Sequence, residues 1–136
     1  MITCVLHYTI DPGKIEAFET FARRWMELVD EHGGTHHGYF LPAEGASDLA
    51  LALFSFPSLA AYEQYRTLFG RHPDFIAADR IREESGCVLR YDRTFMRPLL
   101  PGGEEKPSLR APGHGRSGGD YVGGGGGGGH TLGSGA

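Results

Sequence analysis

The stretch Leu49–Phe56, with the sequence LALALFSF, decides the fold of this chain. It contains no charged residue and a single hydroxyl, that of Ser55. Successive side chains of a strand point to opposite faces of the sheet, so an unbroken apolar run predicts a strand that is buried on both faces. Its 8 residues are a common length for a strand and short for a helix, and Pro57 marks its end. We therefore predict a central strand with both faces covered.

The segments around this strand alternate between strand and helix patterns. The β-branched, aromatic and apolar runs predict further strands over 2–10, 35–41 and 87–97. Apolar residues at spacings of three and four predict helical segments over 14–32, 58–69 and 74–85. The order βαββαβ predicts an α+β, ferredoxin-like domain, which is a four-stranded antiparallel sheet in the order 4-1-3-2 with its helices on one face.

The helices can cover only one face of this sheet, yet the central strand is apolar toward both. An open apolar sheet face is usually an interaction surface. We therefore expect a twofold homodimer in which two sheets pack face to face as a dimeric α/β barrel. This arrangement leaves an enclosed space among sheets and helices, where we expect a small apolar or aromatic molecule to bind between the sheets.

The composition changes near residue 99. Of the 22 glycines, 15 lie after it, including an unbroken run over 123–129. Such a segment has too few apolar residues to offset the entropy of ordering it, so we expect a folded domain over 1–98 and a disordered Gly-rich tail over 99–136. The net charge of −4 and the few basic residues of the tail argue against nucleic acid and anionic membranes as partners.

Targeting and cofactor signals are missing from the sequence. No stretch approaches the roughly 20 apolar residues of a membrane span, and the N-terminus lacks a signal-peptide pattern, so we expect a cytoplasmic protein. Cys4 and Cys87 have neither metal-ligand nor redox-motif spacing, and we expect two buried free thiols at opposite ends of a strand pair. We find no phosphate loop, Walker pattern or nucleophile elbow, and we expect no cofactor.

Two adjacent histidines, His36 and His37, are the most unusual feature of the predicted second strand. Neighbours on a strand point to opposite faces, so the pair cannot readily bind one metal ion, and no third ligand stands at a suitable spacing. One histidine should face the helices or solvent and the other the dimer side. Either could act as an acid/base or hydrogen-bond donor, or be structural. Gly38, next in the strand, indicates a bulge or a close backbone approach.

A second polar cluster is expected where the first and last strands pair. His7 lies on the first strand, and Arg90 and Asp92 lie on the fourth. A histidine beside a carboxylate can be a proton acceptor, although charge pairs across strands are also common on exposed faces. Five tyrosines could place hydroxyls in a cavity, or pack in the core or at its rim: Tyr8, Tyr39, Tyr62, Tyr65 and Tyr91.

Three stretches give the chain a family resemblance: residues 33–42 (GGTHHGYFLP), 51–62 (LALFSFPSLAAY) and 93–98 (RTFMRP). Over residues 1–98 the chain resembles the NIPSNAP family in its bacterial single-domain form. The resemblance implies a ferredoxin-like domain of the dimeric α/β-barrel type. It implies no particular catalytic residue, because the family has no agreed ones to transfer.

Two functions from different classes follow. The first is a dimeric module that binds a small molecule and has structural histidines. The second is a cofactor-independent monooxygenase or isomerase, similar to enzymes of the same barrel superfamily, in which His37 or His7 moves a proton. His36, Tyr39, Tyr8, Arg90 and Asp92 are then the ligand-binding candidates. Trp25 joins them because haem-degrading relatives in that superfamily use a tryptophan near a histidine, although its helical spacing also accounts for it as a core residue.

Overall fold

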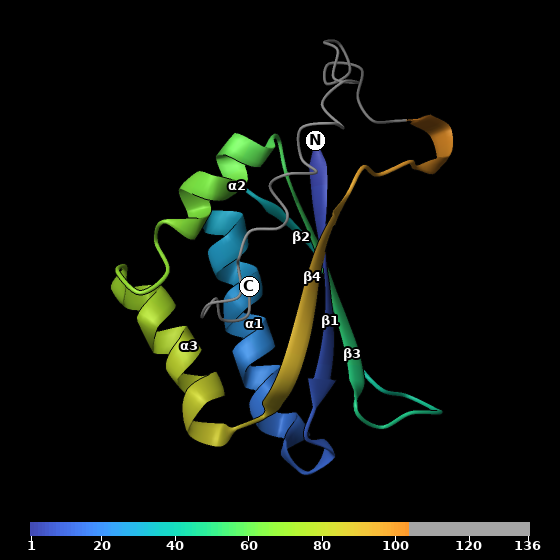
Figure 1. The fold of residues 1–136 in the computed structure, drawn as a ribbon, viewed down its shortest axis with the longest axis vertical. Coiled ribbons are helices and arrows are strands. Elements are labelled where there is room, and N and C mark those ends of the chain that lie inside the picture. The colour runs from blue at the N-terminus through green and yellow to red at the C-terminus, as the bar shows by residue number, and fades with distance from the viewer. Residues whose placement is uncertain (104–136) are drawn as a thin grey trace.

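The computed structural model describes residues 1–103. They form a sheet with helices on one face (Figure 1). The strands are β1 (Ile2–Ile10), β2 (Thr35–Phe40), β3 (Leu49–Phe56) and β4 (Val88–Met96). The helices are α1 (Ile15–Glu31), α2 (Leu59–Arg66) and α3 (Pro73–Ser85), with short 3-10 turns η1 (Pro12–Lys14) and η2 (Pro101–Gly103). The predicted Gly-rich tail lies outside the described residues from 104 onward.

The sheet order is β2-β3-β1-β4, with all neighbours antiparallel. This confirms the predicted ferredoxin-like α+β fold and its 4-1-3-2 order. The apolar strand β3 takes an inner position, as expected, between β2 and β1.

Capping side chains set the helix boundaries. The Asp11 side chain accepts a hydrogen bond from the Gly13 amide, which begins η1 and delays α1 to Ile15. Ser58 Oγ accepts from the Ala61 amide at 3.1 Å and starts α2, as its sequence position predicts. Gly86 ends α3 with a left-handed φ of 70°, a conformation that glycine adopts without strain.

The core lies between the sheet and the helices. Alternate residues of β3 point into it, namely Ala50, Ala52, Phe54 and Phe56, and all four are buried. Figure 1 shows α1, α2 and α3 on this same side of the sheet. We call it the helix face of the sheet, and it carries most of the aromatic side chains.

The opposite face of the sheet, which we call the open face, has no helix over it within residues 1–103 (Figure 1). Leu51 and Leu53 of β3 lie on it half-buried. Its outer apolar residues are much more exposed, with Phe40 at 54%, Leu49 at 56% and Met96 at 53%. Among residues 1–103, helices therefore cover one face of the central strand and leave the other uncovered.

The two cysteines are free and buried, as predicted. Cys4 pairs with Phe95 near one end of the β1–β4 ladder, whereas Cys87 precedes the Val88–Ile10 pair at the other end. Among residues 1–103, no helix is long and apolar enough to cross a membrane.

Candidate functional site

A bulge in β2 separates the two adjacent histidines. The β2–β3 register shifts between His36 and Gly38, and Gly38 has a φ of 117°, which only glycine adopts readily. His36 pairs with Phe54, a core residue of the helix face. His37 bonds to Ser55, which lies on the open face. The prediction that the two rings face opposite sides is therefore confirmed, as is the bulge.

On the open face, three side chains form a chain of hydrogen bonds. His37 Nε2 lies 2.8 Å from Ser55 Oγ, and Ser55 Oγ lies 2.7 Å from Thr3 Oγ1. Ser55 is only 3% exposed, and Thr3 is also buried. The short polar chain thus fixes the ring of the exposed His37 on the open face of the sheet.

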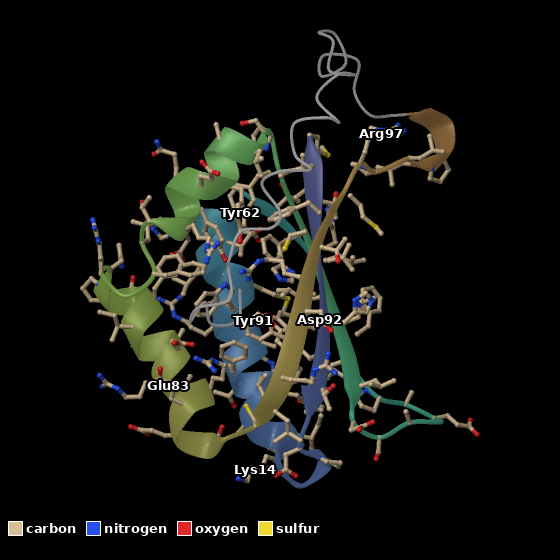
Figure 2. All side chains as sticks on the ribbon, in the orientation of Figure 1. Lys14, Tyr62, Glu83, Tyr91, Asp92 and Arg97 are labelled. Carbon is tan, nitrogen blue, oxygen red and sulfur yellow. The ribbon has the colours of Figure 1, made fainter. Side chains whose placement is uncertain are left out.

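His7 belongs to a different part of the open face. It pairs directly with Asp92 across the β1–β4 ladder, and Arg90 forms an ion pair of 3.0 Å with Asp92. Figure 2 shows Asp92 on the side of β4 that faces away from the helices. The predicted polar cluster is therefore present. This cluster is separate from His37. The hydrogen-bonded chain of His37 ends at Thr3, and Thr3 lies four residues from His7 on β1, roughly 13 Å at the usual rise of a strand.

Tyr8, Tyr39 and His36 meet on the helix face. The Tyr8 and Tyr39 rings have centroids 6.0 Å apart, and the Tyr39 and His36 rings stack at 5.0 Å and 11°. Burial raises the pKa of both phenols well above the ordinary value, and each also interacts with the other's hydroxyl. Both tyrosines are therefore neutral at physiological pH.

The His36 ring has one defined tautomer. The Gly38 amide donates to its Nδ1 at 3.0 Å, so Nδ1 is the acceptor and Nε2 carries the proton in the neutral ring. Nε2 is buried and has no hydrogen-bond partner within the described part of the chain. Burial lowers the pKa of His36 to about 4, although Asp30 opposes the shift. His36 is thus a neutral donor without an acceptor.

Trp25 is a core residue, 1% exposed. Its Nε1 donates to the Tyr65 hydroxyl at 2.7 Å, and its ring packs against Phe69 and Phe75 at centroid distances of 5.6 Å and 5.4 Å. Its only polar atom already has a partner, which leaves no donor for a ligand.

Two further polar groups lie on the helix face: Tyr62, one of the five tyrosines considered from the sequence, and Arg93, which did not stand out there. Tyr62 Oη on α2 and Arg93 Nη1 on β4 are buried, and neither has a hydrogen-bond partner in residues 1–103. Arg93 shares the helix face with its alternate neighbours Tyr91 and Phe95, which pair with Tyr8 and Cys4. The sequence signal that could have identified Arg93 is its position two residues from an aromatic residue on either side, Tyr91 and Phe95.

A groove lies beside Tyr39, between α1 and β2. Its volume is about 240 Å³, and Ala22, Met26 and Leu41 line it with Tyr39. At its rim Arg23 and Glu19 form an ion pair of 3.2 Å. No group of three His, Cys, Asp or Glu side chains that could hold a metal ion occurs within the range the structure describes.

The comparisons with known proteins agree with this architecture. The model of the NIPSNAP family matches residues 5–100. A NIPSNAP family protein of unknown function from Agrobacterium tumefaciens is similar in structure, with 19% identity, a TM-score of 0.62, and coverage of 73% of this chain and 88% of that one. No curated protein matches the chain.

Two other solved structures have the same fold. An uncharacterised NIPSNAP-like domain protein from Burkholderia xenovorans has 17% identity and a TM-score of 0.62, and the match covers 74% of this chain and 88% of that one. A Nitrosomonas europaea protein, provisionally named an antibiotic biosynthesis monooxygenase, has 11% identity and a TM-score of 0.58, with coverage of 74% and 100%. At these identities the likeness concerns the fold.

Proposed function

The chain belongs to the NIPSNAP family, and we propose that it is a homodimer that binds a small apolar or aromatic molecule. We place this molecule on the helix face of the sheet, and not between the two sheets of the dimer, where the sequence led us to expect it. The observation that carries the proposal is the set of buried polar atoms on the helix face that have no hydrogen-bond partner within residues 1–103: His36 Nε2, Tyr39 Oη, Tyr62 Oη and Arg93 Nη1. A buried polar group without a partner costs about 1–3 kcal/mol. A ligand that supplies acceptors to these donors recovers that free energy.

The open face supports the dimer. Phe40, Leu49 and Met96 are more than half exposed on it, around the half-buried Leu51 and Leu53. A second copy of the same face covers this apolar surface in a twofold arrangement, since such an interface is self-complementary. The free buried cysteines fit a reducing compartment, and we place the protein in the cytoplasm.

The aromatic lining of the helix face favours an aromatic ligand. The Tyr62 ring packs against Phe56, Tyr65 and Phe95 at centroid distances of 5.8, 5.7 and 4.8 Å. Aromatic side chains bind planar apolar molecules through large contact areas with few rotatable bonds. Donors within such a lining orient the ligand, as in most small-molecule sites.

Trp25 provides a direct test, because it is the only tryptophan of the chain and lies in this core. We expect its fluorescence to change in a saturable way when the full chain is titrated with small aromatic compounds. A Trp25→Phe variant, which removes the signal, is the control for inner-filter effects. A flat response to a broad panel of such compounds, together with the absence of any bound molecule in the purified protein, would refute ligand binding on the helix face.

A second candidate function is cofactor-independent monooxygenase or isomerase chemistry. The hydrogen bond between His37 Nε2 and Ser55 Oγ favours it, because it orients an exposed imidazole for proton transfer. The monooxygenase name of the Nitrosomonas europaea neighbour is in keeping with it. Its test is single replacement of His7, His36 and His37 by Gln on a substrate identified by screening. Unchanged turnover in all three variants would remove this candidate.

A further inference from the structure

Arg93 Nη1 and the Tyr62 hydroxyl are two buried donors on facing elements, and neither has a hydrogen-bond partner that meets the geometric criteria within residues 1–103. Tyr62 lies on α2 and Arg93 on β4, and Figure 2 shows Tyr62 between the helix layer and the sheet. The Tyr62 ring packs against Phe95, two residues from Arg93, with centroids 4.8 Å apart. The two groups are close enough for the charge of Arg93 to lower the pKa of Tyr62, although burial raises it to about 12 overall. Tyr62 is therefore a protonated donor near neutral pH.

The positive charge of Arg93 is not balanced by a carboxylate. None of the ion pairs within residues 1–103 involves Arg93, and its guanidinium instead lies 5.8 Å from the centre of the Tyr91 ring. Arg66 of α2 is a second cation near Tyr62, and it too makes no ion pair with a described carboxylate. A half-exposed guanidinium without a carboxylate partner among the described residues favours an anion as its ligand.

Within residues 1–103 the Tyr62 O–H proton still lacks an acceptor, because the neighbouring Arg66 side chain can only donate. No described group meets the geometry of a hydrogen bond with it, although Arg66 lies close by in the same helix. The nearby Cys4 thiol offers no competing anion, because burial raises the pKa of Cys4 to about 12 even with Arg93 and Arg66 opposing the shift. The site therefore contains hydrogen-bond donors and cations, and no described carboxylate or thiolate is paired with them.

The helix face of β4 is only partly covered. Tyr91, Arg93 and Phe95 point to the same side as the fully buried Leu6 of β1, yet all three remain half-exposed. Figure 1 shows α3 beside α1 within the helix layer, with β4 at the edge of the sheet. A molecule that reaches Arg93 thus meets accessible aromatic side chains on either side of the charge.

We propose that Arg93 and Tyr62 bind the carboxylate of a small aromatic acid on the helix face of β4. The guanidinium Nη1 and the phenol supply one donor to each carboxylate oxygen, and the aromatic body packs on Phe95 and Tyr91. The two donors match the two oxygens of a carboxylate, whereas a phosphate has more oxygens than these donors satisfy. This inference rests on the proposed function, since it names the ligand class of that site.

Isothermal titration of the full chain with 2-naphthoate and with its neutral analogue 2-naphthamide tests the inference. We expect the naphthoate to bind at least about 10-fold more tightly than the amide, which is the usual strength of hydrogen bonds to charged groups. Arg93→Gln removes this preference and leaves amide binding unchanged. Tyr62→Phe weakens naphthoate binding by roughly 3- to 10-fold. The matched control is Arg97→Gln, which removes the same charge from an exposed residue directly after the same strand.

Equal affinity for the two probes, or a preference that persists in Arg93→Gln, overturns the carboxylate site and leaves small-molecule binding intact. If neither probe binds at millimolar concentration, this ligand class is also overturned. The Trp25 fluorescence titration then tests the proposed function independently. Near-UV circular dichroism of each variant checks that its core packing is unchanged.

Discussion

Trp25 Nε1 donates a hydrogen bond of 2.7 Å to the hydroxyl of Tyr65, which links α1 to α2 inside the core. The hydroxyl of Tyr62, one turn earlier on α2, has no such partner in residues 1–103. The two tyrosines are both buried and both pack on Phe56. They differ in whether the hydroxyl oxygen accepts a hydrogen bond from a described residue. Replacing each tyrosine by phenylalanine therefore gives a matched pair of variants.

Tyr65→Phe is expected to lower the free energy of unfolding by about 1–3 kcal/mol, because it leaves the buried Trp25 N–H without an acceptor. Tyr62→Phe removes a hydroxyl that has no acceptor and is expected to be neutral or slightly stabilising. Urea denaturation of both variants measures the difference. Equal losses of stability in the two would show that the hydrogen bond to Trp25 is not what distinguishes them.

Ser55→Ala is expected to destabilise the fold by about 1–3 kcal/mol, since it leaves the buried Thr3 hydroxyl without its partner and releases His37. Thr94→Ala is the control, because Thr94 is exposed on β4. The measurement is the midpoint of chemical unfolding. A Ser55→Ala midpoint at or above that of the control contradicts a structural role for this chain of hydrogen bonds.

His36 is expected to make the fold less stable as the pH falls. Burial lowers its pKa to about 4 in the folded state, against an ordinary value of 6.5, so the unfolded chain binds the proton first. Stability is unaffected by His36 above about pH 6.5 and declines as the pH falls from there toward 4. The loss at pH 4.5 is roughly 2–3 kcal/mol relative to pH 7.5.

The comparison that isolates this effect is His36→Asn, because the Asn side-chain oxygen can still accept from the Gly38 amide. Unfolding free energies of the two proteins are measured between pH 7.5 and 4.5. We expect the wild-type curve to fall more steeply than the variant curve. Parallel curves would mean that the His36 ring takes up its proton in the folded state as readily as in the unfolded chain.

Gly34 is expected to tolerate no side chain. An added Cβ would lie 2.7 Å from Phe56 Cζ and 2.8 Å from Val29 Cγ1, both of which belong to buried core residues. Gly34→Ala therefore lowers stability by about 1–3 kcal/mol, the usual cost of overpacking. At Gly13 the nearest atom to an added Cβ is Asp11 Oδ1 at 3.5 Å, so Gly13→Ala is the control. Thermal unfolding of the pair measures the cost, and similar melting temperatures would contradict it.

Local patterns were sufficient to predict the sheet. The apolar run of β3, the caps at Asp11 and Ser58, and Gly86 act over a few residues, so they can be read in sequence order. The helix boundary at Ile15 differed from the predicted start because η1 takes up the first turn. The α2 segment ended at Arg66 rather than continuing to residue 69.

The candidate site was less accessible to sequence reasoning, because it depends on register. The sequence predicted that His36 and His37 face opposite sides, but the β2–β3 register and its bulge decide which one meets the core. The predicted residues also divide between two faces: His37, His7, Arg90 and Asp92 on the open face, and His36, Tyr39, Tyr8 and Trp25 on the helix face. Tyr62 was considered only as one of five tyrosines, and Arg93 was missed, because the two come together only through long-range packing of α2 against β4.

The open face is expected to hold the dimer together. Leu49→Glu places a charge at its exposed apolar rim and is expected to shift the chain toward monomer, since a buried like-charge pair at a twofold interface is unfavourable. Ile76→Glu, an exposed apolar position on α3, is the matched control and should leave the assembly unchanged.

Native mass spectrometry of the full chain, purified under mild conditions, tests the central claim most directly. We predict a dimer that carries additional mass from a small molecule and that dissociates in Leu49→Glu but not in Ile76→Glu. A bare dimer would confirm the assembly and leave the ligand to the Trp25 titration. A monomer across micromolar concentrations would contradict the account, because the apolar face of β3 would then have no second copy to cover it.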